Sequence, residues 1–292
     1  MKYSAHPPPK PLRDYVEHLW TIDGEEPPDL TLKFFVTCAP CIVFQHRNGR
    51  SAIAHRIPAD RGEVRNGNHP TSFVRGAITR PFQCVAEGAP SAIGVELKPQ
   101  ALNALFGIDA AELTDAIVDL NAFSTDNLNE QLLNADNKPK QIDLVTQLLT
   151  KRATTSPRSD SLIAQSLRLI HESTGSMHVR DLVKRLNVSE RQFERRFGRT
   201  VGVPPSLYLR IMRFQETVRL MKSGRIERLA DVAYDLGYTD QSHFIKDIRE
   251  LTGYTPKSLS LAVEECATMT RYRTLVRQRI LIEQHRCEAN LC

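Results

Sequence analysis

The stretch RDLVKRLNVSERQFERRFGRTVGVPP, residues 180–205, decides the fold, because its pattern recurs at residues 229–256 as LADVAYDLGYTDQSHFIKDIRELTGYTP. The matched positions are Leu182, Val183, Leu186, Val188, Phe193, Phe197, Gly202 and Pro205 in the first copy, and Val232, Ala233, Leu236, Tyr238, Phe244, Ile248, Gly253 and Pro256 in the second. The offset between the copies is 50 residues before the turn and 51 after it, so the second copy carries one extra residue at its helix junction. The spacing predicts two helix-turn-helix motifs.

In the first copy, Ser189 and Gln192 match a capping box at the start of the second helix. Phe193 and Phe197 lie four residues apart, so they face the same core. The residues left pointing outward are Glu190, Arg191, Glu194, Arg195 and Arg199. A basic, exposed N-terminal half of this helix is the part of such a motif that enters a DNA major groove.

The second copy repeats this arrangement with different exposed chemistry. Gly237 is expected to close its first helix, Asp240 or Thr239 to cap its second, and Phe244 and Ile248 to face inward. The outward residues are Gln241, Ser242, Ile245, Lys246 and Arg249. Glutamine suits adenine, lysine or arginine suits guanine, and an exposed isoleucine suits the thymine methyl group.

One helix is predicted between the two copies, over residues 206–222, after Pro204 and Pro205 and before Ser223 and Gly224. A rod of this length spans roughly 25 Å at 1.5 Å per residue. That length suits two recognition helices about one DNA turn apart, so one chain could read two successive major grooves.

Charge is distributed unevenly along the 292 residues. Residues 179–260 carry 16 Lys and Arg against 10 Asp and Glu, whereas residues 1–178 carry 18 against 20. A basic region behind a slightly acidic body is typical of a nucleic-acid-binding module attached to another domain. The sequence shows neither a long apolar run nor the apolar stretch of a signal peptide, which predicts a cytoplasmic protein without membrane contact.

Before the repeat, short runs rich in β-branched and aromatic residues predict strands. They are LKFFV (32–36), CIVF (41–44), FVRGAI (73–78), FQCVA (82–86) and AIGVEL (92–97). Helical patterns follow at 99–106, ending at Gly107, then after an Asp109 and Glu112 capping box, and around 128–133 and 142–149. The polar stretch KRATTSPRSD (151–160) is the predicted linker.

These patterns predict an α+β chain of two domains and a tail. The predicted parts are a β-rich domain with helices over 1–155, an all-α DNA-binding domain over 160–260, and a basic tail over 261–292. Within the second domain, the first motif covers about 179–200, the linking helix 206–222 and the second motif about 228–251. The tail is expected to pack on the DNA-binding domain.

The segments RQFERRFGRTVGVPPSLYLRIMRF and LADVAYDLGYTDQSHFIKDIRELTGYTP resemble the DNA-binding domain of AraC/XylS-type transcriptional regulators over about residues 160–260. The resemblance implies that the base-contacting residues are Arg191, Glu194, Arg195, Gln241, Ser242, Ile245 and Lys246. Residues assigned to phosphate contact or capping are Ser189, Gln192, Arg196, Arg199 and Arg249. Departures from the family pattern are Ile248 for Phe, Thr217 for Ala, and Leu259-Ser260 for Tyr-Arg, the last of which removes one basic group.

The resemblance also implies partners. They are double-stranded promoter or operator DNA, RNA polymerase, a small-molecule effector and a second copy of the chain. Activation is the commoner mode in the family, and no residue here decides between activation and repression. No cofactor and no catalytic residue is predicted.

The first domain resembles the sensor-like domains that precede AraC-type modules, and a cupin-like barrel is the fold this implies. Candidates for an effector pocket are Arg75, Arg80, Cys84 and Glu96, which lie on or beside predicted strands. No metal is predicted, because His46, His55 and His69 lack the spacing of a ligand set. Cys38 and Cys41 form a lone CxxC, expected to be ordinary thiols, with redox sensing as the alternative.

Two other functions remain open on the sequence alone. A cupin-like enzyme would require bound metal or cofactor and turnover by the first domain. A protein that coats DNA would bind through phosphates, with salt-dependent affinity and little base preference.

Overall fold

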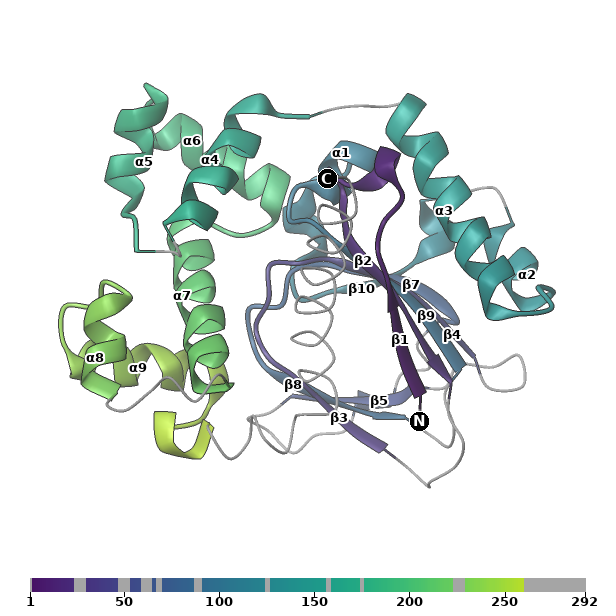
Figure 1. The fold of residues 1–292 in the computed structure, drawn as a ribbon, viewed down its shortest axis with the longest axis horizontal. Helices are drawn as coiled ribbons and strands as arrows, with labels where there is room; N and C mark the ends of the chain where they lie inside the picture. The colour runs from purple at the N-terminus through teal and green to yellow at the C-terminus, as the bar shows by residue number, and fades with distance from the viewer. Residues whose placement is uncertain are drawn as a thin grey trace, which may run out of the picture.

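The computed structural model describes residues 2–23, 30–46, 53–58, 65–66, 70–86, 91–123, 127–155, 159–173, 176–222 and 229–259. Strands and the helices that cover them form the first part of the chain, and the described residues of the second part form helices (Figure 1). The long helix α7 (Pro205–Lys222) runs beside the strands, with the helices of residues 161–201 near one of its ends and those of residues 229–252 near the other (Figure 1). No helix in these ranges is long and apolar enough to cross a bilayer.

Six antiparallel strands form the larger sheet, in the order β1-β2-β9-β4-β7-β10. Their bounds are β1 Lys2–His6, β2 Val16–Asp23, β4 Cys41–His46, β7 Ser72–Arg75, β9 Ser91–Leu97 and β10 Ile117–Asp119. Of these, β4, β7 and β9 lie in predicted strand runs. The strands β1, β2 and β10 are outside those runs and add both edges of the sheet.

Four strands form a second sheet, in the order β3-β8-β5-β6. Their bounds are β3 Leu30–Phe34, β5 Ile53–Pro58, β6 Arg65–Asn66 and β8 Phe82–Ala86. An isolated bridge between Thr37 and Ile78 joins the segments that follow β3 and β7. The strands confirm the predicted β-rich first part of the chain. The described strands form two separate sheets, and neither sheet closes on itself, so the closed cupin-like barrel is not confirmed.

Helices cover one face of the larger sheet. They are α1 (Ala101–Phe106), α2 (Leu128–Leu133) and α3 (Lys138–Thr155), with short 3-10 helices at Lys10–Leu12 (η1), Ala110–Leu113 (η2) and Leu120–Ala122 (η3). Leu19, Val74 and Val95 from the sheet share one buried core with Leu102 and Leu149 from the helices. Gly107 ends α1 in the left-handed region, with φ of 69°.

The predicted linker at 151–160 is partly wrong, because α3 continues to Thr155. Lysine, arginine and alanine at 151–153 are strong helix formers. The guanidinium of Arg152 also donates to the carbonyl oxygen of Phe123 at 2.8 Å and lies 5.6 Å from the ring centre of Phe106. These contacts hold the last turn of α3 on the first part of the chain.

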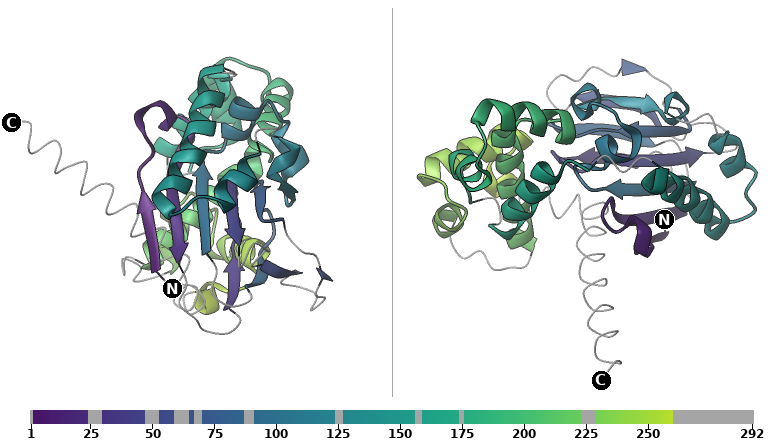
Figure 2. Two further views of the ribbon diagram at one scale, coloured as in Figure 1. Left: turned by 90° about the vertical axis from the view of Figure 1, so that its right-hand side faces the viewer. Right: turned by 90° about the horizontal axis from the view of Figure 1, so that it is seen from above.

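The helical part contains α4 (Ser161–Glu172), α5 (Val179–Leu186), α6 (Glu190–Val201), α7, α8 (Leu229–Asp235) and α9 (Gln241–Thr252). Viewed from above, these helices form a group beside the sheets (Figure 2). Phe193, Phe197, Phe244 and Ile248 are fully buried in one core that all six helices share.

The two parts are packed against each other through apolar contacts. Val36, Cys38 and Ala77 belong to the same buried cluster as Tyr208 and Phe214 of α7. Burial raises the pKa of Tyr208, so its hydroxyl stays protonated. The strand part therefore rests directly on the helix that links the two motifs.

Candidate nucleic-acid interface

The first motif is built as its sequence predicts. Asn187 ends α5 in the left-handed conformation, with φ of 52°, and turns the chain toward α6. The Ser189 side chain then accepts a hydrogen bond from the Gln192 backbone N–H at 3.3 Å, which caps α6. The N-terminal turns of α6 are thereby fixed at the surface.

Of the residues assigned to DNA on α6, most are exposed to solvent. These are Arg191, Gln192, Glu194, Arg195 and Arg199, together with the capping residue Ser189. Within the described residues, neither Arg191 nor Arg195 forms an ion pair. Their guanidinium groups are therefore available to a ligand from solution.

Arg196 differs from its neighbours on α6. Its guanidinium is half-buried and donates two hydrogen bonds to the carboxylate of Asp160, from Nε at 2.9 Å and from Nη2 at 2.6 Å. The hydrogen bond to Asp160 raises the pKa of Arg196. The structure therefore places Arg196 in a contact within the helical part.

The second motif has the same design with a longer turn. Gly237 adopts φ of 74° after α8, and the Asp240 side chain accepts from the His243 N–H at 2.8 Å. Asp240 is therefore the cap of α9, one of the two candidates in the sequence. Counting from the equivalent leucines, α6 begins four residues after Leu186 and α9 begins five after Leu236, which confirms the extra residue in the junction.

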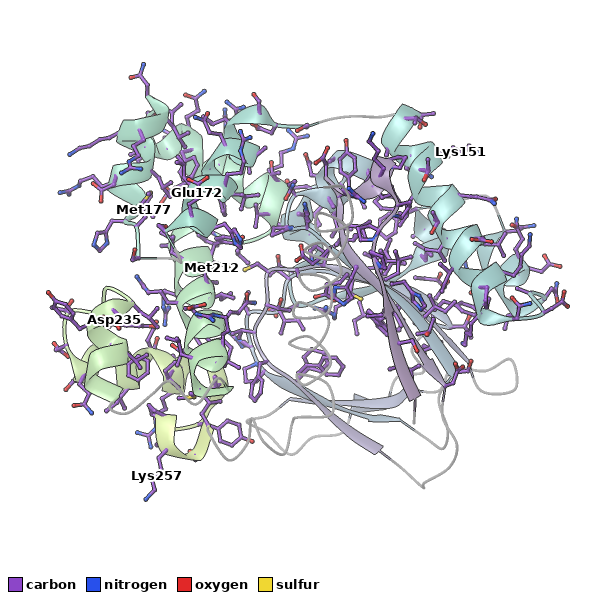
Figure 3. All side chains as sticks on the ribbon, viewed as in Figure 1. Lys151, Glu172, Met177, Met212, Asp235 and Lys257 are labelled. Carbon is purple, nitrogen blue, oxygen red and sulfur yellow. The ribbon has the colours of Figure 1, made fainter. Side chains whose placement is uncertain are left out.

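On α9, four of the residues assigned to DNA are exposed, namely Gln241, Ser242, Lys246 and Arg249. Ile245 is half-buried and packs against the apolar core, so its outward position is only partial. The first motif and the second lie near opposite ends of α7. The labelled Glu172 and Met177 mark the first end, Met212 the middle and Asp235 the second end (Figure 3).

A buried carboxylate holds α9 in place, and the sequence analysis missed it. Asp247 is 3% exposed and accepts from Arg210 Nε of α7 at 2.6 Å and from the Tyr238 hydroxyl at 3.0 Å. Arg213 of α7 lies over the Tyr238 ring, 4.9 Å from its centre. Asp247 lies three residues after Phe244, on the same inward face of α9. A charged residue on a face that is otherwise apolar is a sequence signal that could have identified this buried contact.

The three departures from the family pattern are accommodated. Ile248 and Leu259 are fully buried in the apolar cluster. Thr217 is also fully buried, and its hydroxyl donates to the carbonyl oxygen of Arg213 at 2.9 Å, which satisfies its polar group inside α7. The loss of a basic group at 260 lies outside the described residues, as does the tail over 261–292.

The structure brings two of the four effector-pocket candidates together. Across the larger sheet, His18 pairs with Glu96, Glu96 with Cys41, and Cys41 with Arg75. Residues that pair directly across strands point to the same face, and all four are buried. We call these four residues the polar row. It lies on the opposite face from the helices.

The other two candidates are not part of the polar row. Arg80 is exposed, and the Cys84 side chain lies outside the described residues. The side chains of His46, His55 and His69 are also outside them. Among the residues that the structure describes, no group of three His, Cys, Asp or Glu could hold a metal ion. Cys38 and Cys41 are buried in different clusters, Cys38 against the helical part and Cys41 beside Phe73.

Comparison with protein families assigns both parts of the chain. A helix-turn-helix domain family matches residues 182–260, and a domain of unknown function (DUF6597) matches residues 4–119. The C-terminal part is thus a helix-turn-helix domain of the AraC type, and a DUF6597 domain precedes it. The family resemblance of the repeat is confirmed.

The individual proteins that resemble this chain match it over part of its length or at low sequence identity. The invasion protein InvF of Salmonella typhi, like that of Salmonella typhimurium, is 30% identical over 96 residues, which is 33% of this chain and 44% of InvF. The chain therefore matches less than half the length of these curated relatives. Among solved structures, ToxT from Vibrio cholerae is 12% identical to this chain, with a TM-score of 0.43. The alignment covers 89% of this chain and 98% of ToxT. The C-terminal domain of AraT from Geobacillus stearothermophilus is 19% identical over 36% of this chain and 88% of that domain, with a TM-score of 0.34.

Proposed function

We propose that this protein is a sequence-specific transcription regulator that reads two successive major grooves of promoter DNA. The observation that carries the proposal is the pair of capped recognition helices, α6 and α9, held near opposite ends of one helix and each exposing polar and basic side chains. The mechanism is binding without turnover. Basic and backbone groups bond phosphates and fix the register, while the exposed helix residues select bases.

The length of α7 supports reading by both helices at once. Its 18 residues span about 27 Å at 1.5 Å per residue. Figure 1 shows α6 near one end of α7 and α9 near the other, and this separation suits grooves about 34 Å apart on one side of a duplex. A DNA-coating protein has no need for two differently composed reading faces, and α6 and α9 differ in composition.

Replacing Arg195 or Lys246 by alanine is expected to weaken binding to the preferred duplex by about 1–3 kcal/mol each, because each change removes a base contact. Each variant relaxes base preference at one end of the site only. Titration of labelled preferred and scrambled duplexes measures both effects. Lys140→Ala, which removes one exposed cation from α3, is the matched control. Equal losses on both duplexes would contradict the assignment of Arg195 and Lys246 as base readers.

The remaining parts of the proposal concern the organisation of the regulator. Residues 1–155 act as the effector or oligomerisation domain, and residues 160–260 act as the DNA-binding domain. RNA polymerase, a second copy of the chain and a small-molecule effector are its further partners, with activation as the mode of action in the cytoplasm. An effector acts by binding one arrangement of the two domains better than the other.

We place the effector at the polar row. Burying titratable side chains is costly unless they meet polar partners, and here they line one face of the larger sheet with Arg75 at one end. The Arg75 guanidinium donates to the carbonyl oxygens of Gly76 at 3.2 Å and Ala39 at 3.4 Å. Both acceptors are uncharged, so neither of these two hydrogen bonds neutralises the positive charge. An anionic group on the effector suits that charge.

Arg75→Ala is expected to abolish retention of a co-purifying small anion, because the buried cation that holds it is lost. Mass spectrometry of the extract from denatured protein measures that retention. Arg80→Ala is the matched control, since Arg80 is an exposed arginine five residues away. The same small molecules in all three proteins, or none in the wild type, would contradict this placement.

A further inference from the structure

Two ion pairs occupy equivalent positions of the two motifs with their charges reversed. Phe193 and Phe244 are equivalent, so Arg196 of α6 is equivalent to Asp247 of α9, 51 residues later. Their partners, Asp160 and Arg210, are 50 residues apart, which is the offset of the repeat before its turn. Each pair joins a recognition helix to the helix that precedes its motif, α4 in the first copy and α7 in the second.

In the first copy, the anion is on the preceding helix. The Asp160 carboxylate caps α4 by accepting from the N–H groups of Leu162 and Ile163, and it binds Arg196 through two hydrogen bonds. A two-pronged contact between a guanidinium and a carboxylate fixes the angle as well as the distance. The rotation of α6 about its own axis is therefore tied to the start of α4.

In the second copy, the cation is on the preceding helix. Arg210 binds Asp247 at 2.5 Å and also Glu250 at 2.6 Å, both on α9. Burial alone would lower the pKa of Arg210, and the two carboxylates outweigh burial and raise it. Tyr238, in the turn before α9, adds its hydroxyl to the same carboxylate of Asp247.

The reversal of charge also disfavours an exchange of places between the two recognition helices. If α6 packed on α7 in the place of α9, Arg196 would meet Arg210. If α9 packed on α4, Asp247 would meet Asp160. Both exchanges bring like charges together, so the wrong arrangement is disfavoured although the apolar patterns of the copies match.

We propose that Asp160–Arg196 and Arg210–Asp247 are positioning pairs, each of which sets the orientation of its own recognition helix in the groove. This inference rests on the proposed reading of DNA by α6 and α9. It assigns Arg196 a role within the protein in place of a phosphate contact. It also makes base selection at each end of the site depend on one pair.

Asp160→Asn and Asp247→Asn test the two pairs separately. Asparagine keeps an acceptor oxygen for the cap of α4 or for Arg210 and removes the charge. The full-length wild type and each variant are used to select duplexes from a random pool, with the two blocks assigned by Arg195→Ala and Lys246→Ala. Glu216→Gln is the matched control, because it removes a carboxylate that pairs with Arg219 within α7 alone.

A crossed pattern is expected. Asp160→Asn lowers base preference about fivefold or more in the α6 block only, and Asp247→Asn does so in the α9 block only. Arg210→Lys, which keeps the charge and loses the fork, replaces Asp247→Asn if that variant does not fold. Equal changes in both blocks, or none in either, would overturn the positioning role. A wild type that enriches no sequence overturns the proposed function itself, which is a separate result.

Discussion

Phe193→Ala is expected to lower the free energy of unfolding of the helical part by about 3–5 kcal/mol, and Phe244→Ala by the same amount. Both rings are fully buried at equivalent positions of the two motifs. Phe193 packs against Phe197 with ring centres 5.4 Å apart, and Phe244 packs against Tyr238 at 5.2 Å. Each deletion leaves a cavity at the point where a recognition helix meets the core.

Chemical denaturation followed by circular dichroism measures this loss. Tyr234→Ala is the matched control, because Tyr234 is an aromatic residue of α8 that is 83% exposed, and its removal should change stability by less than about 0.5 kcal/mol. If the phenylalanine variants unfolded at the same denaturant concentration as the wild type, the inward orientation of these rings would be wrong. DNA binding by both variants should fall in step with the folded fraction.

Gly202→Ala is expected to destabilise the chain by more than Gly253→Ala, although the two glycines are equivalent in the repeat. Both have positive φ, 94° and 76°, so alanine costs about 1–2 kcal/mol of backbone strain at either position. At Gly202 the new Cβ would also lie 2.9 Å from the carbonyl oxygen of Ala110 and 3.0 Å from Thr114 Oγ1, in the first part of the chain. At Gly253 it would meet no described atom within 4 Å.

The difference between the two variants therefore reports the packing of the two parts. We expect Gly202→Ala to cost about 1–3 kcal/mol more than Gly253→Ala, because the crowding involves backbone that cannot rotate away. The Thr114 hydroxyl donates to the Gly202 carbonyl oxygen at 2.6 Å, so this approach is close and polar as well. Equal melting temperatures for the two variants would mean that η2 does not rest on the end of α6 in solution.

The helical part was predictable because its signals are local. Caps, apolar spacing and turn residues lie within a few positions of each other, so Ser189, Asp240 and the prolines at the start of α7 mark helix starts directly in the sequence. The linking helix was predicted over 206–222 and is found over Pro205–Lys222. The exposed faces of α6 and α9 follow from the same periodicity.

The pairing of the strands and the contacts between distant segments depend on residues far apart in the sequence, so no local pattern predicts them. Pairing of β2 with β9 joins segments about 75 residues apart, and no local pattern specifies that register. The polar row appears only once this register is known. Arg196 looks like another exposed arginine in the sequence, and only Asp160, 36 residues earlier, makes it part of an internal contact.

The measurement that tests the central claim most directly is selection of duplexes by the full-length protein from a random pool at near-physiological salt. Reading by α6 and α9 together predicts two enriched blocks with centres about ten base pairs apart, one altered by Arg195→Ala and the other by Lys246→Ala. Strong binding without any enriched sequence would contradict the claim and favour a protein that coats DNA through its phosphates.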